Sequence, residues 1–156
     1  MTDPARRPRI VVDADACPVK DEVYRVAGRC GLAVVVATNK PMRVPPEPWV
    51  RLVVVPGSFD AVDDWIAGEV AAGDVVVTAD IPLAGRCIAK GARVLGPRGR
   101  EFTEEGIGDA LATRALMAHL RETGTITGGP AAFEKRDRSA FLQALDRLVQ
   151  ASLAGR

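Results

Sequence analysis

The sequence predicts an α/β fold with three layers: a parallel sheet in the strand order 3-2-1-4-5 between two layers of helices, followed by two C-terminal helices. Short runs of Val, Ala and Leu, typical of strands buried on both faces, alternate along the chain with helical stripes of apolar residues. Their order along the chain requires right-handed parallel crossovers. The length of 156 residues suits one domain. We expect this domain at residues 9–152, behind a disordered tail of residues 1–8.

Apolar runs and turn residues set the boundaries of the expected elements. The strands are expected at residues 9–13, 32–37, 51–55, 75–78 and 93–95. The first four helices are expected at residues 18–30, 59–70, 81–90 and 104–123. Ser58, Thr103 and Asp137 are the expected caps, the last of them for the final helix. Residues 38–49 contain four prolines and are expected to form an irregular loop.

Composition and charge exclude several classes of protein. The net charge of +1 gives no global field for nucleic acid or membrane, so any basic surface must be local. The chain has no apolar run long enough to span a bilayer and no secretory signal pattern, so we expect a cytoplasmic protein without a membrane partner. The three cysteines are far apart in the sequence, which argues against a disulfide framework or a zinc cluster.

Three aspartates follow the predicted strands where a ligand site is expected. Asp13 and Asp15 are two residues apart at the end of the first strand, so their side chains share one side if the strand continues. Asp80 ends the fourth strand, which neighbours the first at the edge where open α/β sheets bind ligands. Such acids repel one another, and Mg²⁺ or Mn²⁺ would relieve the repulsion. We expect all three to be catalytic metal ligands; the alternative for Asp15 is a helix cap.

Polar residues after neighbouring strands are expected to complete this site. Asp60 and Asp63 open the helix after the third strand, where acids also favour the helix dipole. We expect Asp60 to be the further metal ligand, with Asp63 as the second choice. Ser58, in the preceding turn, could orient an acid or a phosphate. Asn39, after the second strand, could face the crevice or serve only in a turn.

Four basic residues are candidates for binding nucleic acid. Lys20 follows the first acidic pair, and Lys135, Arg136 and Arg138 form a cluster before the last helix. Each could be an ordinary solvated residue, but together they could hold a polyanion backbone. Other chemistry has little support, because the single histidine, His119, lies within a predicted helix and no Walker or GxGxxG loop follows a strand.

Five segments carry a resemblance to a known family. They are residues 12–20 (VDADACPVK), 37–39 (ATN), 56–63 (PGSFDAVD), 78–84 (TADIPLA) and 133–138 (FEKRDR). Over about residues 9–150 the chain resembles the YaiI/YqxD family of bacterial proteins, which are similar to PIN domains. The resemblance implies the 3-2-1-4-5 sheet and an acidic cluster that holds Mg²⁺ or Mn²⁺ and cuts RNA.

The resemblance can be followed acid by acid. Asp13 and Asp80 resemble the PIN acids at the ends of the first and fourth strands, and Asp15 resembles an additional acid beside the first. PIN domains usually carry a further glutamate on a middle helix. No glutamate stands in that place here, so Asp60 or Asp63 would substitute for it.

The function we expect is metal-dependent hydrolysis of phosphodiester bonds, with RNA favoured over DNA, and two alternatives stay open. Asp13 and Asp15 are also spaced as in haloacid-dehalogenase-like phosphatases, as nucleophile and acid/base. Against this, Cys17 stands where Thr or Val is usual and Lys90 is poorly placed for the expected lysine. The chain could instead bind nucleic acid or a protein without catalysis. The predicted helix 104–123 could support a homodimer.

Overall fold

The computed structural model describes residues 7–15, 17–128 and 132–155. It confirms an α/β fold with a mostly parallel sheet of six strands in the order β3-β2-β1-β4-β5-β6. The strands are β1 (Ile10–Asp13), β2 (Val34–Thr38), β3 (Val50–Val54), β4 (Val75–Val77), β5 (Arg93–Leu95) and β6 (Glu101–Phe102). The helices are α1 (Lys20–Cys30), α2 (Phe59–Glu69), α3 (Ile81–Ala89), α4 (Glu104–Glu122) and α5 (Lys135–Leu153). Residues 1–6 of the expected tail lie outside the described residues.

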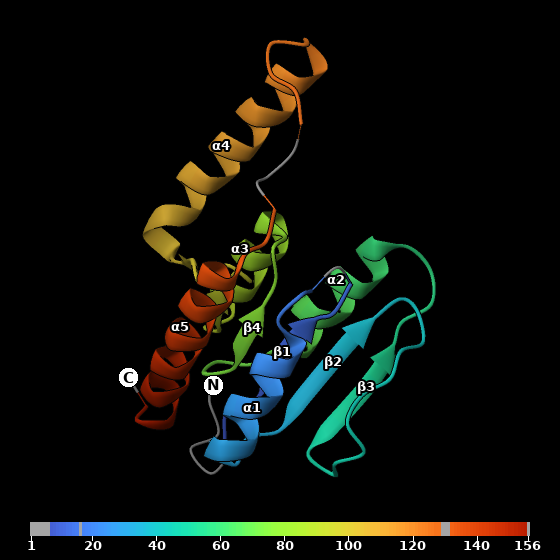
Figure 1. Ribbon diagram of the computed structural model, residues 1–156, viewed down its shortest axis with the longest axis vertical. Coiled ribbons are helices and arrows are strands. Elements are labelled where there is room, and N and C mark those ends of the chain that lie inside the picture. Colours follow the sequence, from blue (N-terminus) through green and yellow to red (C-terminus); the bar gives the residue numbers. More distant parts are fainter. Residues whose placement is uncertain (1–6, 16, 129–131, 156) are drawn as a thin grey trace.

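The central strand β1 lies between β2 and β4, and all three are buried (Figure 1). Val12 is in register with Val36 on one side and with Val77 on the other. Alternate residues of these strands face opposite layers: Val12 packs with α1 and α5, whereas Val11 packs with α2 and α3. Apolar residues are therefore needed at successive positions, which explains the runs of valine.

The structure corrects three details at the ends of elements. The short strand β6 pairs antiparallel with β5 and was not expected, since two residues give no periodic signal. Helix α5 begins at Lys135 with Glu134 as its N-cap, and Asp137 completes the capping box instead of serving as the cap. Ser58 occupies the N-cap position of α2, but its side chain makes no capping hydrogen bond.

A buried carboxylate fixes the amino end of β1. Asp74, before β4, accepts hydrogen bonds from the Arg9 backbone N (3.1 Å), from Arg9 Nη2 (3.1 Å) and from the Ala71 N (3.0 Å). Arg9 Nη1 also donates to Glu69 Oε1 at 2.9 Å. Because Arg9 and Asp74 precede neighbouring strands, this contact holds β1 and β4 together at the edge opposite their carboxyl ends.

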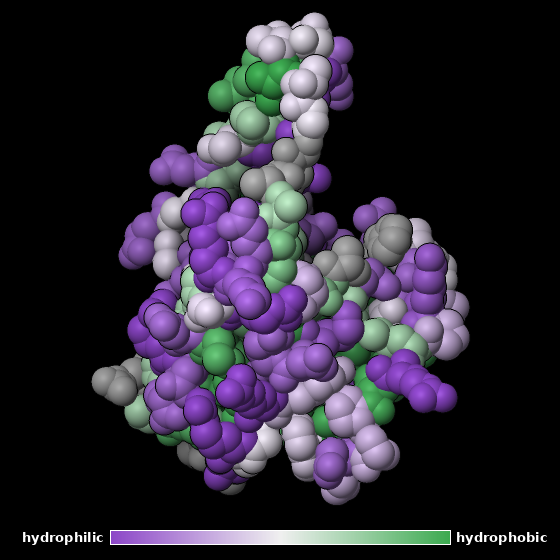
Figure 2. All heavy atoms as spheres, in the orientation of Figure 1, coloured by the Kyte–Doolittle hydropathy of each residue, from purple (hydrophilic) through white to green (hydrophobic). Residues whose placement is uncertain are grey.

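Helix α4 projects away from the sheet (Figure 1). Among its residues, Ala110 alone is buried, whereas Leu111, Leu116 and Met117 expose 39%, 55% and 38% of their surface. The hydropathy surface in Figure 2 likewise shows apolar atoms on the projecting end of the molecule. No helix in the described part of the chain is long and apolar enough to cross a membrane.

Replacing Leu116 on α4 with Ser should change the free energy of unfolding by no more than about 0.5 kcal/mol, because the side chain is mostly exposed. Leu145→Ala on α5 is the contrast: that side chain is fully buried, and we expect a loss of about 2–5 kcal/mol. Urea denaturation of both variants measures the difference. A loss above about 1.5 kcal/mol for Leu116→Ser would contradict the exposure of this helix.

Candidate functional site

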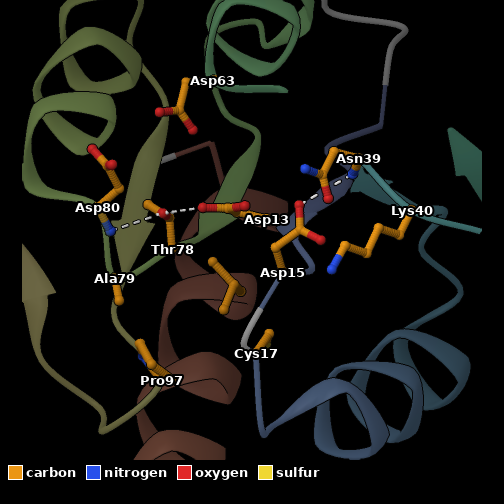
Figure 3. A pocket seen from close by; sticks show the side chains of 11 residues that line it. Asp13, Asp15, Cys17, Asn39, Lys40, Asp63, Thr78, Ala79, Asp80 and Pro97 are labelled. Atoms are coloured by element: carbon orange, nitrogen blue, oxygen red, sulfur yellow. Dashed lines mark hydrogen bonds between the residues drawn. The ribbon is translucent and has the colours of Figure 1, made fainter. Parts of the chain in front are cut away.

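A pocket of about 560 Å³ opens at the carboxyl ends of β1, β2 and β4 (Figure 3). Ligands bind at this edge in open α/β sheets because the strand order changes direction there. The pocket is lined by Asp13, Asp15, Cys17, Asn39, Lys40, Asp63, Val77, Thr78, Ala79, Asp80 and Pro97. Three of the acids predicted from the sequence, Asp13, Asp15 and Asp80, are thus brought together.

Thr78 connects two of these acids. Its hydroxyl donates to Asp13 Oδ2 at 2.8 Å and accepts a hydrogen bond from the Asp80 backbone N at 3.0 Å. Asp80 is also the N-cap of α3, since its Oδ1 accepts from the Leu83 N at 2.8 Å. One oxygen of Asp13 and one of Asp80 therefore accept hydrogen bonds, and no described residue donates a hydrogen bond to the other two.

Asp15 is held by the last residue of β2 and the residue that follows it. Its Oδ1 accepts from Thr38 Oγ1 at 2.8 Å, and its Oδ2 accepts from the Asn39 backbone N at 3.1 Å. The Thr38 hydroxyl also lies 3.0 Å from the Lys40 carbonyl oxygen, but its single hydrogen belongs to the carboxylate, the stronger acceptor. The expected alternative of a helix cap is wrong for Asp15, because Val19 is the N-cap of α1.

The structure places Asp63 in the pocket, whereas Asp60 and Ser58 are exposed and do not line it. Asp60 was expected to be the metal ligand ahead of Asp63, but of the two it is Asp63 that lines the pocket. Burial, together with the negative charges of Asp80, Asp13 and Asp60, raises the pKa of Asp63 to about 6. In Figure 3 its carboxylate points from α2 toward Asp13 and Asp80.

Burial and like charges in the pocket disfavour the ionised forms of Asp13 and Asp63. Burial raises the pKa of Asp13. The negative charges of Asp15 and Asp80 raise this pKa further, whereas the hydrogen bond from Thr78 lowers it. Burial also raises the pKa of Cys17, which keeps its thiol protonated and argues against a thiolate nucleophile. An arrangement of this kind favours binding of a cation.

The donor atoms suit Mg²⁺ or Mn²⁺, which prefer oxygen ligands. Besides the carboxylates, Asn39 Oδ1 is buried with no hydrogen-bond partner in the described structure. As they stand, however, the described side chains include no group of three or more His, Cys, Asp or Glu residues that could hold a metal ion. The chemistry of the donors therefore fits a divalent cation, although their present arrangement does not form a complete coordination shell.

Comparisons with known proteins give the family. Residues 11–151 match the family model described as "Uncharacterized BCR, YaiI/YqxD family". The chain belongs to this family. A UPF0178 protein of Rhodospirillum centenum is 57% identical over 151 residues, 94% of this chain and 98% of the relative. A UPF0178 protein of Agrobacterium fabrum is 57% identical over 145 residues, 93% and 95% of the two chains. None of these names states an activity, and no solved structure matches.

In this YaiI/YqxD protein, two of the residues predicted to bind nucleic acid contact oxygen atoms of the protein instead. Lys20 Nζ donates to the Cys17 carbonyl oxygen at 2.7 Å. Arg138 Nη1 donates to Glu22 Oε1 at 2.8 Å and to the Pro18 carbonyl oxygen at 3.0 Å. Both side chains hold the segment that connects β1 to α1, beside the pocket, and neither lines it.

The other two residues predicted to bind nucleic acid lie at the start of α5. Lys135 and Arg136 are exposed, and Arg136 Nε forms an ion pair with Glu134 Oε2 at 3.1 Å. Neither residue lines the pocket.

Three polar residues of the YaiI/YqxD site were missed as candidates from the sequence. Thr38, Lys40 and Thr78 contact the acids or line the pocket. Thr38 and Thr78 stand within the family segments ATN and TADIPLA, at the end of the valine-rich runs 34–37 and 75–77. That position was the available signal, since residues at the carboxyl ends of neighbouring parallel strands meet.

Proposed function

We propose that the pocket binds Mg²⁺ or Mn²⁺ and hydrolyses phosphodiester bonds, with RNA as the favoured substrate. The observation that supports this most strongly is the meeting of Asp13, Asp63 and Asp80. They come from β1, α2 and the segment after β4, and all three line one pocket. Burial and repulsion by the charges of Asp80 and Asp13 raise the pKa of Asp63, and burial and repulsion by Asp15 and Asp80 raise the pKa of Asp13. A bound cation would offset that repulsion and attract a phosphate.

The residues of the chain divide into two groups in this proposal. Asp13, Asp63 and Asp80 would hold the cation, which would activate water and stabilise charge on the phosphate. Asp15 accepts hydrogen bonds on both oxygens, from Thr38 at the end of β2 and from the Asn39 backbone N, and would shape the side of the pocket next to β2. Lys135 and Arg136, exposed at the start of α5, would contact the substrate backbone.

Two measurements on the wild-type chain test the proposal. Calorimetry follows its titration with Mn²⁺, and a labelled oligoribonucleotide is then incubated with the Mn²⁺-loaded protein. Saturable Mn²⁺ binding and metal-dependent cleavage are expected. No heat of binding, even with oligonucleotide present, would overturn it. Salt-sensitive RNA binding without cleavage in any divalent metal would select the non-catalytic alternative.

The raised pKa of Asp63 predicts how stability varies with pH. Because the folded-state pKa of about 6 exceeds the unfolded value, the native state binds the proton more tightly. The contribution of Asp63 to the free energy of unfolding should therefore fall as pH rises from about 4 to about 6. Asp63→Asn should remove this fall and gain roughly 1 kcal/mol at pH 7, a value discounted for solvent screening.

Urea denaturation of wild type and Asp63→Asn at several pH values between 4 and 8 measures this effect. Asp64→Asn is the control, because Asp64 is exposed on the same helix and does not line the pocket. The difference between wild type and Asp63→Asn should grow with pH and then level off. A difference that is constant across this range would contradict the raised pKa.

A further inference from the structure

One positively charged side chain, that of Lys40, lines the acidic pocket. Among the described residues that line it, Lys40 is the one Lys or Arg, against the four aspartates Asp13, Asp15, Asp63 and Asp80. The Lys40 side chain is exposed, and no ion pair joins it to another residue in the described ranges. This distinguishes Lys40 from Lys20 and Arg138, whose charged groups are bound to carbonyl or carboxylate oxygens.

The backbone around Lys40 is fixed by the same hydrogen bonds that hold Asp15. The Asn39 backbone N donates to Asp15 Oδ2 at 3.1 Å, and the Lys40 backbone N donates to Thr38 Oγ1 at 3.2 Å. Thr38 in turn donates to Asp15 Oδ1 at 2.8 Å. The position of the Lys40 Cα is therefore set by main-chain contacts, and its ammonium group is free to meet a ligand.

Figure 3 shows where this group lies. Asp63 and Asp80 are on one side of Asp13, whereas Lys40 is on the other side, beyond Asp15, with its ammonium group directed toward the pocket. A cation held near Asp13 would thus leave the Lys40 side of the pocket to a second, negatively charged group.

We propose that Lys40 binds a phosphate group of the substrate, in a subsite beside the carboxylates. The inference rests on the proposed function, because it takes the substrate to be a phosphodiester. Four carboxylates repel a phosphate strongly. The divalent cation on one side of the phosphate and the Lys40 ammonium group on the other would offset that repulsion. Lysine binds phosphate as a flexible point charge, which suits an exposed side chain on a fixed backbone.

This role predicts effects of opposite sign on two ligands. Lys40→Gln should weaken binding of fluorescein-labelled oligouridylate, measured by anisotropy with Ca²⁺ present, by about fivefold at low salt. The slope of log affinity against log salt should become smaller by about 0.7, the value for one lost contact to a single strand. Removal of the positive charge should tighten Mn²⁺ binding, measured by calorimetry without oligonucleotide, by about threefold. Lys40→Arg should retain both wild-type affinities within about twofold.

Arg43→Gln is the matched control, since Arg43 is exposed in the same loop and does not line the pocket. It should leave both affinities within about twofold of wild type. Unchanged oligouridylate binding by Lys40→Gln would overturn the subsite, and so would weaker binding of both ligands, which indicates a distorted pocket. Failure of the wild type to bind Mn²⁺ overturns the proposed function instead, and the oligouridylate measurement still decides the role of Lys40.

Discussion

Asp13→Asn should weaken Mn²⁺ binding by at least about tenfold and reduce RNA cleavage by at least about a hundredfold. Asp13 ends the central strand β1 and lies between Asp80, which follows β4, and Asp15, which follows β1 (Figure 3). Burial and the charges of Asp15 and Asp80 raise its pKa, so a cation bound here would offset the repulsion among these carboxylates. Asparagine keeps the shape and an oxygen that accepts from Thr78, but removes the charge.

The fold should survive this substitution. Because the ionised form of Asp13 is disfavoured in the native state, we expect Asp13→Asn to unfold at the same urea concentration as wild type at pH 7, or at a higher one. Calorimetry with Mn²⁺ and a cleavage assay measure the two losses. Asp109→Asn, on the projecting helix α4, is the control for removal of one carboxylate. If Asp13→Asn bound Mn²⁺ as tightly as wild type, the proposed cation site would be wrong.

Asp74→Ala should have the largest effect on stability, a loss of about 3–5 kcal/mol in the free energy of unfolding. The Asp74 side chain is only 1% exposed and accepts three hydrogen bonds, two from Arg9 and one from the Ala71 N. Alanine would leave these donors without their acceptor and would leave Arg9, with 18% of its side chain exposed, without its buried counter-ion.

Urea denaturation at pH 7 measures this loss, and Glu69→Ala is the control. Glu69 contacts the same Arg9 at 2.9 Å but is 35% exposed, so its removal should cost no more than about 1 kcal/mol. Mn²⁺ binding by the folded fraction of Asp74→Ala should be retained, since Asp74 precedes β4 at the edge away from the pocket. A loss below about 1 kcal/mol would show that the contact does not hold β1 and β4 together.

The sequence by itself determined the five parallel strands and the acidic edge of the sheet. Runs of valine at β1, β2 and β4 have no polar positions, so these strands must be buried on both faces, which puts them at the centre of the sheet. Once β1 and β4 are neighbours, Asp13 and Asp80 must meet, because both follow the carboxyl ends of their strands. Local patterns and the rule for right-handed crossovers predict a doubly wound parallel sheet, and the resemblance to PIN domains implied the order that makes β1 and β4 neighbours.

Only the tertiary structure decided which polar residues face the pocket. Asp60 and Asp63 are alike in sequence, and the packing angle of α2 on the sheet turns Asp63 inward and leaves Asp60 in solvent. Lys20 and Arg138 were expected to bind nucleic acid, but in the structure they contact the carbonyl oxygens of Cys17 and Pro18, and Arg138 also contacts Glu22 on α1. Lys40 became a candidate because Asp15, distant in sequence, fixes the backbone before it. The contacts of Arg138 and Asp15 join residues far apart in the chain, and local periodicity carries no information about them.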